Sequence, residues 1–83
     1  MKAPEIRRLS LAHDKATLDD AAAALMAGDE PAIRVEGDPE DGERLTHVML
    51  AQRVLDRVAA GLPHAAAYRE VMGAVRVVLT DSD

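Results

Sequence analysis

The sequence lacks cysteine and has almost no aromatic residues. Tyr68 is the single residue among phenylalanine, tyrosine and tryptophan, and none of the 83 residues is a cysteine. Without thiols the chain can form no disulfide bond, thiolate metal site or cysteine nucleophile. A surface that stacks nucleic-acid bases is also excluded, because it would need several aromatic rings.

Basic charge and long apolar runs are scarce as well. Lysine and arginine total 10 against 15 aspartate and glutamate residues, so the net charge is −5. Because nucleic-acid binding relies on clustered basic residues, we expect no nucleic-acid partner. No apolar run reaches the roughly 18 residues of a membrane-spanning helix, and the first residues lack the apolar core of a secretory signal. We therefore expect a cytoplasmic protein that has no membrane partner.

The residues that are present fit one small helical domain. Hydrophobic residues make up 48% and charged residues 30% of the chain, as in globular proteins. A chain of this length has room for a single core. We expect one mainly α domain over residues 1–83, built from three helices, with frayed ends at 1–4 and 80–83.

The first of these helices is predicted at residues 14–27. Thr17 and Asp20 form a variant of the capping box near its start, and a glycine follows its last residue, as is common at helix ends. The segments 5–11 and 32–36 are expected to be extended. They could pair as one short two-stranded ribbon.

The second and third helices are predicted to form an antiparallel hairpin. Asp38 followed by proline is a typical helix start, although the regular helix could begin as late as Glu43. This helix should end at Ala60, because the sequence Gly-Leu-Pro follows. The third helix then runs from Pro63 or the next residue to Leu79, and the short connection favours the hairpin.

The apolar faces of these two helices are wide. Each covers roughly 200° of a helical wheel, about twice what a surface helix of a monomer needs. Few other residues remain to cover them, so we expect a homo-oligomer, most simply a dimer with a four-helix core. A monomeric three-helix bundle is the alternative. The expected interface residues are Val48, Gln52, Leu55, Ala59, Leu62, Tyr68, Val71, Met72, Val75 and Val78.

Gln52 is the one polar member of a series that steps by three and four residues from Leu45 to Leu62. It could set the register of a helix pair across the interface. It could equally lie at the solvent edge of the apolar stripe.

Glu43 and His47 are the candidate metal ligands. They lie one helical turn apart, where a carboxylate and an imidazole can share a divalent metal or can simply bond to each other. His13 and His64 would complete a zinc site only if the fold brought them to His47. The simpler interpretation is a histidine that is satisfied locally, and we expect no cofactor.

The stretch PAIRVEGDPEDGERLTHVMLA, followed by AYREVMGAVR, resembles a small uncharacterised bacterial protein family. The shared pattern, PAI-x-VEG…GE-x-LTHV…AYRE, covers about half of the chain. The resemblance implies no activity. It marks Glu36-Gly37, Gly42-Glu43 and Leu45-Thr46-His47 as the residues to examine.

The function expected from these observations is non-enzymatic. The chain has no G-x-S-x-G nucleophile elbow and no glycine-rich phosphate loop. We expect a self-associating accessory or scaffold protein that offers a helical surface to a protein partner. One alternative is a protein that binds a metal or small ligand through His47 and Glu43. Another is an antitoxin-like regulator that folds on its toxin.

Overall fold

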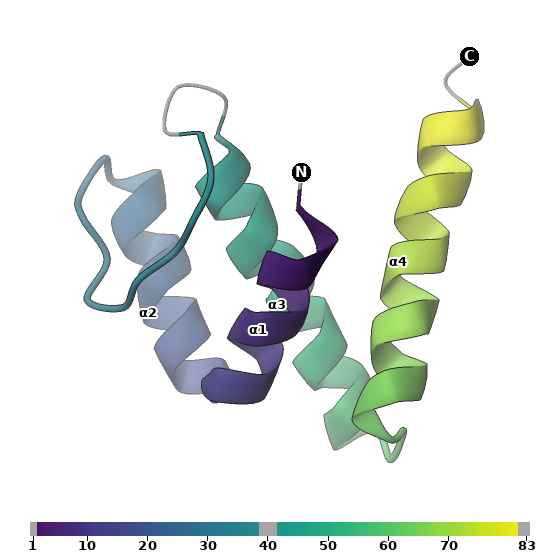
Figure 1. Cartoon of the computed structure of the whole chain (residues 1–83). Coiled ribbons are helices and arrows are strands. Elements are labelled where there is room, and N and C mark those ends of the chain that lie inside the picture. Colours follow the sequence, from purple (N-terminus) through teal and green to yellow (C-terminus); the bar gives the residue numbers. More distant parts are fainter. Residues whose placement is uncertain (1, 39–41, 82–83) are drawn as a thin grey trace.

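Over residues 2–38 and 42–81, which the structure describes with side chains up to Val75, the computed structural model contains four helices and no strand (Figure 1). The mainly helical prediction is therefore confirmed, but a fourth helix replaces the expected ribbon. The helices are α1 (Ala3–Ala12), α2 (Lys15–Met26), α3 (Glu43–Ala59) and α4 (His64–Asp81).

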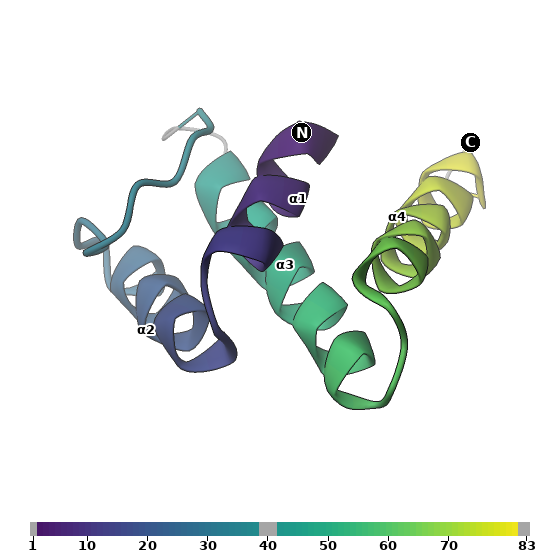
Figure 2. The same cartoon turned by 60° about the horizontal axis from the view of Figure 1, so that its bottom comes forward.

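Helix α3 is the central element of the fold. All of the extensive packing between helices involves it, because α1, α2 and α4 each contact α3. In both views α2 and α4 lie on opposite sides of α3, and α1 lies across it (Figures 1 and 2). The buried hydrophobic residues are Ile6, Leu9, Leu18, Ala21, Ala22, Val35, Val48, Leu50, Ala51, Val54, Ala67 and Val71.

The predicted ribbon is wrong, because residues 5–11 belong to α1 and residues 32–36 form an irregular segment. Pro4 lies in the first turn of α1, where its missing N–H removes no helical hydrogen bond. Two of the four buried residues of α1 are polar. The apolar residues alone therefore do not repeat with the period of a helix. The four buried residues are Glu5, Ile6, Leu9 and Ser10.

Helix α2 agrees with the helix predicted at 14–27, but the predicted cap is wrong. Asp14 caps the helix instead of Thr17, whose backbone N–H donates to Oδ1 of Asp14 at 2.9 Å. At the other end Gly28 has φ = 81°, and the N–H of Asp29 bonds back into the last turn at 2.8 Å. These bonds form the Schellman motif that the glycine predicts.

The predicted hairpin is present as α3 and α4. Helix α3 begins at Glu43, the later of the two expected starts, and residues 39–41 of the earlier start lie outside the described residues. At its end Gly61 has φ = 110°, and the N–H of Leu62 bonds to the carbonyl of Arg57 at 3.1 Å. The Gly-Leu-Pro sequence therefore ends the helix as expected.

The two ends of the chain are more helical than predicted. Residues 3–4, which were expected to fray, form the first turn of α1. Helix α4 continues past Leu79 to Asp81. None of the helices in the described part of the chain combines the length and apolar content that crossing a bilayer requires.

The wide apolar arc of α3 finds its partners within one chain. Helices α1, α2 and α4 each pack against α3, and of the apolar arc Val58 and Ala59 stay exposed. Helix α1, which the sequence did not predict, supplies cover that the three expected helices would lack. Most of the width of this arc is therefore accounted for without a second copy of the chain.

Candidate functional site

His47 connects two segments outside α3 to that helix through hydrogen bonds. Its side chain is 0% exposed. The Nε2 atom accepts a hydrogen bond from the backbone N–H of Lys2 at 2.9 Å, and Nδ1 lies 2.7 Å from the carbonyl oxygen of Glu36. Because Nε2 is an acceptor, the proton of the neutral ring lies on Nδ1 and is donated to Glu36. The ring therefore holds the start of α1 and the segment before α3 in place.

An ion pair on α1, in which the carboxylate is buried, completes this attachment. The Glu5 side chain is 3% exposed and accepts hydrogen bonds from the Arg8 guanidinium at 2.6 and 2.7 Å. It also accepts the backbone N–H of Glu36 at 2.8 Å, while Arg8 donates to the carbonyl of Arg34 at 3.0 Å. The hydrogen bonds from Arg8 lower the pKa of Glu5 below its ordinary value, although burial opposes them.

This geometry gives the predicted metal pair no support. Backbone groups occupy both ring nitrogens of His47, and the Glu43 carboxylate accepts the backbone N–H of Asp38 at 3.1 Å. His13 and His64 do not complete a site either. Within residues 2–38 and 42–81, no three histidine, aspartate or glutamate side chains are placed to hold a metal ion.

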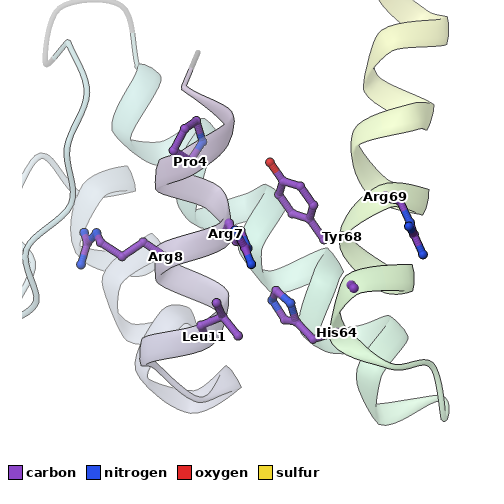
Figure 3. A pocket seen from close by; sticks show the side chains of 8 residues that line it. Pro4, Arg7, Arg8, Leu11, His64, Tyr68 and Arg69 are labelled. Carbon is purple, nitrogen blue, oxygen red and sulfur yellow. The ribbon is translucent and has the colours of Figure 1, made fainter.

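A groove of about 520 Å³ runs between α1 and the first half of α4 (Figure 3). His64 and Tyr68 of α4 extend into this space, with their rings 12° from parallel and their centroids 6.4 Å apart. The Tyr68 hydroxyl donates to the carbonyl of Ala3 at 3.1 Å, which fixes the ring between the two helices. Pro4 and Leu11 form apolar ends of the groove on the α1 side. We call this feature the α1/α4 groove.

Ser10 and His64 lie within hydrogen-bond distance, yet they do not form an activated nucleophile. Oγ of Ser10 is 2.8 Å from Nε2 of His64, but the hydroxyl donates its proton to the carbonyl of Arg7 at 3.0 Å. The serine oxygen therefore accepts the Nε2–H of His64. Ser10 is also 4% exposed and does not line the groove. This contact ties α1 to the first turn of α4.

The ionised side chains that line the α1/α4 groove are all arginines. Arg8 turns away from it towards Glu5, whereas Arg7 lies over the space between the helices (Figure 3). Arg69 stands at the α4 edge and points outward in the same view. Among the residues that the structure describes, neither Arg7 nor Arg69 makes a side-chain hydrogen bond or ion pair.

The residues predicted to form an interface are divided between core and surface. Gln52 bonds to Asp19 of α2 at 2.7 Å, so its amide connects two helices of the same chain. Val78 lies outside the described side chains. Val48 and Val71 are buried, Leu55, Leu62, Tyr68, Met72 and Val75 are partly buried, and Ala59 is exposed.

Sequence reasoning missed the contribution of α1 to this site. Arg7 and Ser10 fall in a segment that was expected to be extended, so neither was placed beside α4. The available indication is the spacing of Glu5, Ile6, Leu9 and Ser10, which repeats with the period of a helix only if the two polar residues are counted.

A protein-family model described as "Family of unknown function (DUF6952)" matches residues 1–80. No curated protein and no solved structure matches the chain.

Proposed function

Because the chain belongs to DUF6952, a family of unknown function, we propose its function from its own surface. The predicted membership of an uncharacterised family is confirmed. We propose that the protein is a non-enzymatic helical protein that pairs with a second copy of itself, as a cytoplasmic accessory or scaffold protein. The paired molecule then offers its helices to a protein partner.

The observation that carries this proposal is the position of the second half of α4. Helices α3 and α4 diverge from their connecting turn, so the C-terminal end of α4 lies away from α3 (Figures 1 and 2). The last buried residue of α4 among the described side chains is Val71, and Met72 and Val75 are only partly covered. The sequence of this half continues as AVRVVL. A helix segment of this apolar composition gains stability by packing on another helix.

The groups available for chemistry support a non-enzymatic role. The serine nearest to a histidine is buried and directs its proton to a backbone carbonyl. His47 has no ring nitrogen left for a substrate or a metal. The buried carboxylate of Glu5 and its partner Arg8 serve the attachment of the segment 34–36 to α1.

Size-exclusion chromatography with light scattering tests the proposal. At high micromolar concentration we expect a mass of about twice 8.9 kDa, which falls towards 8.9 kDa on dilution. Met72→Glu should remain at 8.9 kDa throughout, because it places a charge on the partly covered face of α4.

Met49→Glu is the matched control. Met49 is the same residue type and is 44% exposed, but it lies on α3. This variant should dimerise like the wild type. A wild-type mass of 8.9 kDa at every concentration would contradict the proposal, as would equal loss of pairing in both variants.

A further inference from the structure

We propose that the α1/α4 groove binds a small organic anion with a flat apolar body, such as an aromatic carboxylate. This inference goes beyond self-association and does not depend on it. It is carried by two features that meet in one place: the nearly parallel rings of His64 and Tyr68, and an unpaired arginine on the α1 side of the groove.

The first feature is the pair of rings. His64 and Tyr68 lie nearly parallel, and each is held by one hydrogen bond to α1, through Ser10 and Ala3 respectively. Fixed rings can pack on a flat apolar group without losing further side-chain freedom. A groove of about 520 Å³ also falls within the range of sites that take small molecules.

The second feature is the charge around the groove. Although the net charge of the chain is −5, the residues that line this groove include arginines and no acidic residue. Arg8 is paired with Glu5 and Arg69 points outward from α4, so the charge available to a ligand in the groove comes from Arg7. A guanidinium without a partner is suited to a carboxylate, because it can donate two parallel hydrogen bonds.

Binding of 2-naphthoate, compared with its neutral analogue 2-naphthamide, tests this inference. The ligands would be titrated into the full chain and followed by NMR, where the Tyr68 ring is the only one of its kind. We expect the largest shifts at Tyr68 and His64. We also expect a dissociation constant for naphthoate about tenfold below that for naphthamide, because only the anion gains a charge-assisted hydrogen bond.

Arg7→Gln should remove this preference for the anion and leave the weaker binding of naphthamide unchanged. Arg53→Gln is the control, because Arg53 is another exposed arginine but lies on α3 outside the groove. It should keep the tenfold preference. Three results would overturn the inference: equal affinity for both ligands, a preference that survives Arg7→Gln, or shifts centred away from Tyr68. Repeating the titration on Met72→Glu separates it from self-association.

Discussion

At the scale of single residues, polar groups in the interior decide where the non-helical segments lie. Both ring nitrogens of His47 form hydrogen bonds with backbone groups, and the Glu5 carboxylate accepts a hydrogen bond from a third backbone group, the N–H of Glu36. Buried polar groups must be hydrogen-bonded to avoid a cost of about 1–3 kcal/mol each. These two side chains therefore select one position for the segment around Glu36 out of the many that hydrophobic burial alone would allow.

Replacing His47 should reveal this role. His47→Ala leaves the N–H of Lys2 and the carbonyl of Glu36 without their partner and opens space in the core, so we expect a loss of about 2–4 kcal/mol in the free energy of unfolding. Urea denaturation followed by circular dichroism measures it. His13→Ala is the control, because His13 is only partly buried, and its effect should stay within about 1 kcal/mol. Equal effects of the two variants would contradict the assignment.

The lowered pKa of Glu5 makes part of the stability depend on pH. A carboxyl with a folded-state pKa below its ordinary value of 4.5 stabilises the fold fully above that value. This contribution disappears as the pH falls through the folded-state pKa. We therefore expect Glu5→Gln to be less stable than the wild type near neutral pH, and the difference to shrink as the pH falls below 4.5.

Denaturant titrations of both proteins between neutral and acidic pH measure that difference. Asp14 and Glu30 also have lowered pKa values, through bonds to Thr17 and Arg44. The variant retains both groups, so the comparison isolates Glu5. A difference that stays constant with pH would show that the Arg8 pair does not depend on the charge of Glu5.

At the scale of elements, local sequence determines where helices end. Gly28 and Gly61 both adopt positive φ values after the last turn of a helix, and both are followed by the hydrogen bonds of a Schellman motif. Gly37 differs, because its conformation is required by packing as well. A Cβ at this position would lie 2.9 Å from the backbone nitrogen of Arg44. The backbone also has φ = 149°, which residues with a side chain rarely adopt.

Two alanine substitutions should therefore have opposite effects on stability. Gly73 lies inside α4 with open space around a Cβ, so Gly73→Ala should stabilise the protein by about 0.5–1 kcal/mol through helix propensity. Gly37→Ala should destabilise it by at least about 1 kcal/mol, because the new methyl group meets Arg44. Thermal unfolding of both variants gives the two signs, and an increase in Tm for Gly37→Ala would contradict the packing argument.

At the scale of the whole molecule, stability is shared because every other helix packs on α3. Tyr68 reports the contact between α4 and α1, whereas circular dichroism reports all of the helices. Small domains with one core unfold in a single transition. We expect the two unfolding curves to coincide in dilute wild-type protein.

Val54→Ala tests this shared core. Val54 is 0% exposed in α3, and its truncation should lower the free energy of unfolding by about 1–3 kcal/mol. Both probes should shift by the same amount. Val58→Ala, at a position that is 36% exposed, should have an effect below about 1 kcal/mol. A Tyr68 transition that separates from the helical signal would show that α4 unfolds on its own.

The parts of the fold that could be predicted are those with local causes. The hairpin of α3 and α4 follows from apolar spacing and from the Gly-Leu-Pro sequence between the helices. Residues 32–36 were expected to be extended and to pair as a ribbon. They form an irregular segment instead, in which Val35 is 7% exposed, because β-branched residues also occur in irregular segments that cover a core. His47 was expected to be satisfied locally, and its partners at Lys2 and Glu36 could not be predicted.

The sequence by itself determined the helical class, the carboxyl ends of α2 and α3, and the aliphatic character of the core, because apolar periodicity and glycine caps act between residues a few positions apart. Only the tertiary structure decided that residues 3–12 form a helix, that this helix covers α3, and that Arg7 lies beside His64 and Tyr68. Those outcomes depend on contacts between residues far apart in the sequence, such as Lys2 with His47, Ser10 with His64 and Ala3 with Tyr68. No local pattern specifies such contacts, because each forms only after the other helices have packed on α3.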